Sequence, residues 1–340
     1  MTTVKRFPFP RQYPGFHTCD EFENAPPISF AIKQILQNDG ATLIGGLPGH
    51  GKTLILLSMA KALLGAPGTK LWGHFDVLET ASRVVYLTPE VSISPFKQRL
   101  KLFDIYRYAE SGRLLVRTLS FASMKGLDDP DILNVAKGSH IFLDSAIRFV
   151  EGKESDASDN QSGLAKHIFD LLRAGARSVI GAHHSPKSFG GADTMTLENV
   201  FRGTGDIGAM LSAGFGVKQL DAPLAPKNII HIENVKPRDF EPCGPFQLIG
   251  RPYITEEHDF RMYKRPGECR SLAEEKGKGG APQEERDRRA KNKDVLRRLL
   301  EKEPKAKAKD LAKRLKKETG VEYKVGSIRR LRAEIRKEVA

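Results

Sequence analysis

The segment from residue 46 to residue 53 constrains the fold of this chain more than any other feature. It reads Gly-Leu-Pro-Gly-His-Gly-Lys-Thr and fits the pattern G-x-x-x-x-G-K-[ST]. An apolar run at 41–45 precedes it, and a stretch rich in Leu, Ala and Met at 52–64 follows it. A strand, a glycine loop and a helix in this order turn backbone N–H groups toward phosphate oxygens at the positive end of the helix. The alternative is a glycine turn that only joins a strand to a helix.

The positions of this loop have predicted tasks in binding ATP and Mg²⁺. Lys52 is expected to contact the β- and γ-phosphates, and Thr53 to place its hydroxyl on the metal ion. The backbone of the loop and of the first helical turn is expected to hold the phosphates. The predicted nucleotide contacts, besides Lys52 and Thr53, are Gly46, Pro48, Gly49, His50, Gly51 and Leu54.

Two further apolar runs end in a carboxylate. Residues 140–144 read His-Ile-Phe-Leu-Asp, and Asp144 is the predicted second ligand of the Mg²⁺ shell. Because Ser145 rather than a glutamate follows it, the general base is expected elsewhere. Residues 83–90 supply Glu90 at the C-terminal end of another predicted strand, where α/β sheets bind ligands. Each carboxylate alone could instead be a solvated residue at a strand end.

Short β-branched or apolar runs alternate with helical patterns over residues 28–262. Besides the runs at 41–45, 83–88 and 140–144, they lie at 178–182 and 228–234. This alternation predicts an α/β domain with a mostly parallel sheet that is covered by helices on both faces. We expect an N-terminal arm at 1–27 before this domain, and a flexible linker at 263–290 and a helical domain at 291–340 after it.

These motifs together resemble the RecA-like hexameric P-loop ATPases, in particular the plasmid replicative helicases of RepA type and their DnaB and RadA relatives. The resemblance spans roughly residues 28–250. It covers the glycine loop, the segment 86–90, the strand that ends in Asp144, and the segments 181–187, 202–205 and 236–238. It implies a RecA-like fold and a homo-oligomeric ring, a hexamer, that acts on DNA.

The resemblance also implies roles for individual residues. The glutamate that matches Glu90 activates the attacking water, and the polar residue that matches His184 senses the γ-phosphate. The K-x-R pair that matches Lys236 and Arg238 reaches the ATP held by the adjacent subunit. For this pair, a basic strand edge that discourages aggregation is the alternative. Metal binding by His184 together with His183 is disfavoured, because adjacent side chains on a strand point to opposite faces.

Two polar segments, 151–162 and 185–208, match loops that face the central channel of the ring in the resembled family. Lys187 and Arg202 are therefore candidate contacts to a nucleic-acid backbone. The first segment contains several acidic residues, so a plain solvated loop is the alternative there. These acidic residues are Glu151, Glu154, Asp156 and Asp159.

Basic charge is concentrated near the end of the chain. Residues 271–340 carry 23 Lys plus Arg against 13 Asp plus Glu, and this accounts for most of the net charge of +13. Three helical patterns at 292–301, 306–319 and 327–339 predict a small helix-turn-helix or winged-helix unit. A solvated charged face or a docking module for a protein is the alternative. The predicted DNA contacts on the third helix are Arg329, Arg330, Arg332 and Arg336.

The sequence thus predicts an ATPase that works on single- or double-stranded DNA, favoured as a replicative helicase of a plasmid, phage or similar element. The alternatives are an ATP-dependent DNA-binding regulator or recombination mediator that does not unwind DNA, and a P-loop small-molecule kinase. The three cysteines are dispersed, and no apolar run is long enough to span a membrane. We therefore expect a cytoplasmic protein without disulfides or a membrane anchor.

Overall fold

A computed structural model describes residues 15–66, 68–119, 126–149, 157–201, 204–220, 228–250, 260–274, 295–301, 303, 306–319, 328 and 335. Side chains are described for all of these except 157–162 and 204–206. The chain divides into two compact units, Met1–Ser271 and Leu272–Ala340.

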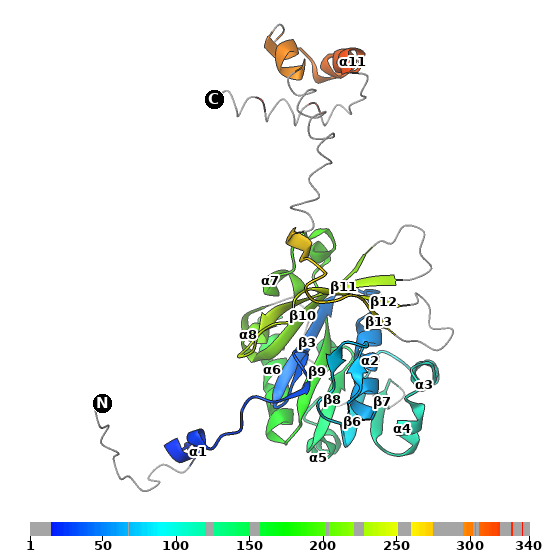
Figure 1. The fold of residues 1–340 in the computed structure, drawn as a ribbon, viewed down its shortest axis with the longest axis vertical. Helices are drawn as coiled ribbons and strands as arrows, with labels where there is room; N and C mark the ends of the chain where they lie inside the picture. Colours follow the sequence, from blue (N-terminus) through cyan, green and yellow to red (C-terminus); the bar gives the residue numbers. More distant parts are fainter. Residues whose placement is uncertain are drawn as a thin grey trace, which may run out of the picture. The chain divides into compact units, whose positions relative to one another are not determined.

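A large central sheet forms the first unit, and nine strands of it lie among the described residues (Figure 1). Six neighbouring strands run parallel, and three antiparallel strands extend one edge. In spatial order the strands are β13 (Arg261–Lys264), β12 (Phe246–Gly250), β11 (Asn228–Pro237), β10 (Leu211–Leu220), β3 (Gly40–Gly46), β9 (Ser178–His184), β8 (Ser139–Leu143), β6 (Arg83–Thr88) and β7 (Leu114–Thr118).

This order confirms the predicted α/β class and the RecA-like architecture. The strand before the glycine loop, β3, lies centrally, and β9 separates it from β8, the strand that leads to Asp144. All five predicted apolar runs form strands of this sheet. Their C-terminal ends meet along one edge, which brings the residues that follow them into one neighbourhood.

Helices cover both faces of the sheet. Helix α2 (Lys52–Leu64), which has the predicted bounds, packs on the face that carries Ile44, Phe142 and Ile180. Helix α6 (Ala157–Arg173) lies on the opposite face (Figure 1). The other helices of this unit are α1 (Cys19–Glu23), α3 (Ile93–Leu102), α4 (Tyr106–Glu110), α5 (Pro130–Ala136), α7 (Leu197–Val200) and α8 (Thr204–Met210).

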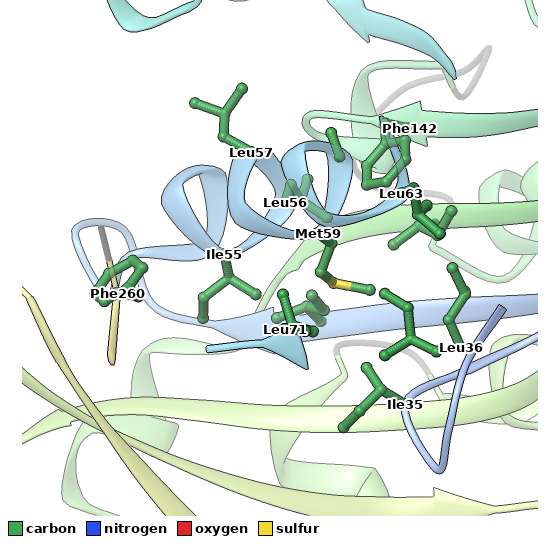
Figure 2. Packing of buried hydrophobic residues seen from close by; sticks show 14 of the residues in the cluster. Ile35, Leu36, Ile55, Leu56, Leu57, Met59, Leu63, Leu71, Phe142 and Phe260 are labelled. Atoms are coloured by element: carbon green, nitrogen blue, oxygen red, sulfur yellow. The ribbon is translucent and has the colours of Figure 1, made fainter. Parts of the chain in front are cut away.

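Helix α2 is buried on nearly all sides, which fixes the loop at its N-terminus. Its side chains Ile55, Leu56, Met59 and Leu63 are at most 1% exposed (Figure 2). Leu71, from the hairpin formed by β4 (Lys70–Leu71) and β5 (Phe75–Asp76), belongs to the same cluster. Burial of each such side chain contributes roughly 1.5–3 kcal/mol. A helix that is apolar all round is expected only in such a position.

The structure shows further elements near the two predicted boundaries of the α/β domain. The predicted arm contains α1, whose first turn is closed by a capping box between Thr18 and Glu21. Two short strands, β1 (Phe30–Ile32) and β2 (Leu36–Gln37), follow it. The sheet continues to Lys264, two residues past the predicted end of the domain.

The described part of the second unit contains helices. Residues 295–301 and α11 (Ala308–Thr319) form helices. Their apolar side chains share one buried cluster with two residues of the predicted third helix, Ile328 and Ile335. The four arginines predicted to contact DNA lie outside the described residues, so the helix-turn-helix assignment stays a prediction.

Candidate nucleotide site

The glycine loop joins the end of β3 to the start of α2 and lies against the neighbouring strands. Gly49 and Gly51 have φ angles of +82° and +84°, which strongly favour glycine. A Cβ atom on Gly46 would lie 2.7 Å from the carbonyl oxygen of Val217. His50 contacts the same oxygen through its Nδ1 atom at 3.1 Å. The loop is therefore held in one shape by its glycines and by the adjacent strand β10.

Lys52 is a buried cation at the mouth of this loop. Its side chain is 7% exposed, and Nζ donates hydrogen bonds to the carbonyl oxygens of Gly46 at 2.8 Å and Leu47 at 2.9 Å. Burial lowers the pKa of Lys52 to about 8, although nearby Asp144 and Glu90 act in the opposite direction. A desolvated ammonium group next to the free N–H groups of a helix N-terminus fits a phosphate group.

Thr53 and Asp144 lie side by side beside Lys52. The hydroxyl of Thr53 donates to Asp144 Oδ1 at 3.1 Å, and the hydroxyl of Tyr86 donates to Asp144 Oδ2 at 3.1 Å. Burial raises the pKa of Asp144, and both hydroxyl donors oppose this shift. A hydroxyl and one carboxylate fit Mg²⁺, which usually takes few protein ligands together with substrate phosphates. Within the described part of the chain, no group of three or more His, Cys, Asp or Glu residues could hold a metal ion.

Glu90 follows β6 and faces the same site. Its Oε1 atom accepts hydrogen bonds from Ser145 Oγ at 3.0 Å and from Arg148 Nε at 2.6 Å. Burial alone would raise the pKa of Glu90, but the hydrogen bonds from Arg148 and Ser145 outweigh it, so the pKa is lowered. Burial lowers the pKa of Lys52, and the charge of Glu90, after that of Asp144, opposes this shift.

The two histidines at the end of β9 differ in their surroundings. His183 is buried, and its ring packs edge to face against Phe201 at 5.8 Å. His184 is half-buried and pairs in register with Gly46 of the loop strand. Burial, and then the charge of Lys52, lower the pKa of His184. His184 is thus the histidine that the sheet brings to the end of the loop strand.

The structure does not bring Lys236 and Arg238 to the loop of their own chain. Strand β11 runs antiparallel to β10, so Lys236 pairs with Gly214 and the Arg238 N–H bonds to Ser212. These positions lie toward the N-terminal ends of the parallel strands, whereas the loop lies at their C-terminal ends. Lys187 is exposed at the start of a 3-10 helix, Lys187–Gly191. Arg202 lies outside the described residues.

Sequence reasoning missed Tyr86 and Arg148, which bind the two carboxylates. It also missed a cavity of about 620 Å³ that is lined by aromatic and cationic side chains, including Trp72, Tyr263 and Arg265. Phe260 lies at this cavity and also beside the loop, because a Cβ atom on Gly51 would be 3.9 Å from its ring. Aromatic and cationic surfaces of this kind can hold a nucleobase.

The family model described as the AAA domain matches residues 13–189, just over half of the chain. The chain belongs to this family. The AAA domain match takes in the glycine loop, Glu90, Asp144 and His184 and ends before Lys236. The family match, the glycine loop and the strand order of the sheet together identify the protein as a RecA-like P-loop ATPase. In the described part of this AAA domain protein, no helix is long and apolar enough to cross a bilayer.

Two solved structures are similar to this AAA domain protein. One is a KaiC-like protein from the hyperthermophilic archaeon Pyrococcus horikoshii OT3, with 13% identity, a TM-score of 0.45, and coverage of 70% of this chain and 96% of that chain. The other is a DnaB-like replicative helicase from a study of its interactions with primase, with 12% identity and a TM-score of 0.49. That alignment covers 71% of this chain and 66% of the helicase chain. A comparison with curated protein sequences gave no match.

Proposed function

We propose that this protein is a ring-shaped motor that hydrolyses ATP to act on DNA, as a replicative helicase does. The observation that carries the proposal is the convergence of a buried cation, a hydroxyl–carboxylate pair and a second carboxylate at the loop. These groups are Lys52, Thr53 with Asp144, and Glu90. Phosphoryl transfer depends on this combination, because the transition state needs positive charge around the phosphate and a base for the nucleophile.

Each side chain has a distinct part in the proposed hydrolysis. Lys52 and the loop N–H groups bind the phosphates, and Thr53 and Asp144 hold Mg²⁺. The ion would neutralise charge that develops on the phosphate oxygens. Glu90 orients a water molecule and takes its proton, because its lowered pKa leaves the carboxylate ionised. His184 can hydrogen-bond a terminal phosphate from the neighbouring strand end.

Assembly into a ring is part of the proposal. Lys236 and Arg238 lie away from the loop of their own chain, so they can contribute to hydrolysis only at the loop of another copy. An arginine supplied by a neighbour contributes orders of magnitude in rate in related phosphoryl-transfer enzymes. We therefore propose a homo-oligomer, a hexamer, in which each subunit completes the site of the next.

DNA is the proposed partner because of the charge of the last 70 residues. Proteins that neutralise many phosphates bind nucleic acid with a strong dependence on salt. The net charge of +10 on residues 271–340 suits such a partner, and Lys187 is exposed three residues after His184. A regulator or recombination mediator would share this charge but would not separate strands.

Turnover, mass and strand separation test the proposal together. ATP turnover is measured with and without single-stranded DNA, the mass is measured by size-exclusion chromatography with light scattering, and a forked duplex is the substrate for unwinding. We expect DNA to stimulate turnover, a mass near six protomers, and strand separation that requires ATP. The Lys52→Ala protein is the matched control. A monomer whose turnover ignores DNA would refute the motor, and ATP-dependent binding without strand separation would favour the regulator.

A further inference from the structure

The second partner of Glu90, Arg148, has no part in the proposed chemistry so far. It belongs to a short 3-10 helix, Ala146–Phe149, that directly follows the strand leading to Asp144. Its Nε atom lies 2.6 Å from Glu90 Oε1. This is the oxygen that Ser145 also binds. The other carboxylate oxygen, Oε2, forms no hydrogen bond with the described residues.

The backbone that carries Arg148 is fixed, whereas its side chain is exposed. Ala146 and Phe149, on either side of it, are buried, and the Arg148 N–H bonds to the carbonyl oxygen of Ser145. The side chains of Arg148 and Glu90 are 60% and 37% exposed. Exposed ion pairs of this kind contribute little to stability, so a stronger anion can displace Glu90 from Arg148 at little cost.

Arg148 follows β8, the strand next to β9, and both strands end at the edge of the sheet where the glycine loop lies. The charge of Arg148 lowers the pKa of His184, and the charge of Lys52 does the same. Arg148 therefore lies in the electrostatic surroundings of His184, one of the residues predicted to contact the terminal phosphate. Among the residues that the structure describes, the charged and titratable groups around Glu90 include Arg148 from the 3-10 helix, His184 from β9, Lys52 from α2 and Asp144 after β8.

We propose that Arg148 pairs with Glu90 while the site is empty and transfers to the terminal phosphate when ATP binds. Ser145 keeps Glu90 in position after the transfer, because its hydroxyl holds the carboxylate independently of Arg148. A carboxylate paired with a guanidinium is a weaker base, so the exchange would make Glu90 basic only when substrate is present. This inference rests on the proposed hydrolysis of ATP and assigns the residue that couples substrate binding to activation of the base.

The pH dependence of turnover distinguishes this exchange from a static contact. The acid limb of kcat/KM reports the free enzyme, and the acid limb of kcat reports the complex with substrate. In the unsubstituted protein, we expect the acid limb of kcat/KM to lie at lower pH than the acid limb of kcat. In Arg148→Ala, the limb of kcat/KM should rise to meet that of kcat, and kcat should fall about tenfold or more. Arg148→Lys, which keeps the charge, should recover part of kcat.

A matched control is Arg173→Ala, which removes an exposed arginine from a pair with Asp170 on α6, outside the site. It should leave both pH limbs unchanged. Unchanged kcat and limbs in Arg148→Ala would overturn the inference, as would an equal shift of both limbs, which indicates a contact kept throughout turnover. Glu90→Gln distinguishes failure of the Arg148 exchange from failure of the proposed role of Glu90 as the base. If Glu90→Gln abolishes turnover and Arg148→Ala changes nothing, the exchange alone is wrong, whereas full turnover by Glu90→Gln removes the base and the exchange together.

Discussion

At the scale of single residues, Lys52 combines a cost in stability with a gain in binding. Burial lowers the pKa of Lys52 from 10.5 to about 8, so the folded protein holds this proton less firmly than the unfolded chain does. A shift of this size corresponds to roughly 3 kcal/mol against folding at pH values below 8. Between pH 8 and 10.5 the unfolded chain binds more protons at this group, so the penalty shrinks as the pH rises. A phosphate bound beside the ammonium offsets the same penalty.

Lys52→Met should therefore stabilise the nucleotide-free protein while it abolishes ATP binding. At pH 7 we expect an increase of about 1–3 kcal/mol in the free energy of unfolding, because the variant buries an apolar chain in place of a charge. The increase should diminish above pH 8. Denaturant titrations at several pH values measure it, with Lys61→Met from the same helix as the control. A variant that is less stable than the wild type at pH 7 would contradict this account.

Tyr86 is expected to affect Mg²⁺ binding through its hydrogen bond to Asp144. Its hydroxyl binds Asp144 Oδ2, and its fully buried ring stacks on Phe142 at 5.7 Å. Tyr86→Phe removes the hydroxyl and keeps the ring. We expect the Mg²⁺ concentration needed for half-maximal turnover to rise about tenfold or more, because partners of metal ligands tune the ligands. Tyr106→Phe on α4 is the control, and an unaltered Mg²⁺ requirement in Tyr86→Phe would show that Asp144 needs no such support.

At the scale of elements, close packing around β3 decides where glycine is required. Gly46 has an ordinary φ angle, yet a Cβ atom there would lie 2.7 Å from the Val217 carbonyl oxygen. This contact is with backbone, so β10 must shift to relieve it. Gly163, within α6, has no atom within 4 Å of the corresponding position. The same substitution should therefore have opposite effects at these two sites.

Gly46→Ala should lower the free energy of unfolding by about 1–3 kcal/mol through overpacking. Gly163→Ala should raise it by about 0.5–1 kcal/mol, because alanine favours the helix. Thermal and chemical denaturation of the two variants measure the difference. Equal destabilisation by both would mean that the strand contact does not determine the requirement for glycine at residue 46.

The extent to which the sequence predicts these elements depends on how local their signals are. The runs that become β3, β6, β8, β9 and β11 are apolar and uninterrupted, as in buried strands. Strand β10 was not predicted, because Gly214 and Gly216 interrupt its pattern. The structure explains these glycines, since Cβ atoms there would meet Phe201, Val200 and Met195. These contacts join separate elements, so the sequence pattern of the strand alone does not predict them.

The site follows the same rule. Lys52 and Thr53 come from one local motif, and Asp144, Glu90 and His184 come from strand ends, so the sequence could predict that they meet. The approach of Tyr86 to Asp144 depends on the register of β6 against β8, and that of Arg148 to Glu90 on the turn after β8. Neither has a signal in the spacing of residues. The predicted contacts of Lys187 and the arginines to DNA stay predictions.

At the scale of the whole molecule, the distribution of the site over the sheet argues for assembly. Lys52 and Glu90 lie at the C-terminal edge of the parallel strands, whereas Arg238 lies near their N-terminal ends. Its guanidinium donates to the carbonyl oxygen of Ala209 and does not approach the loop. A single subunit cannot bring these two sets together without breaking the sheet. Two copies can, if the β11 end of one faces the loop of the next.

Mixing two inactive variants tests this arrangement directly. Lys52→Ala removes the binding side of a site, and Arg238→Ala removes the side that a neighbour would supply. Each variant alone should lose turnover, with Arg238→Ala lower by at least tenfold at unchanged mass. In mixed rings, some interfaces pair an intact Lys52 with an intact Arg238, so a mixture should recover part of the wild-type rate. If the two residues act within one chain, each variant lacks one of them in every subunit, and the mixture should stay inactive at all ratios.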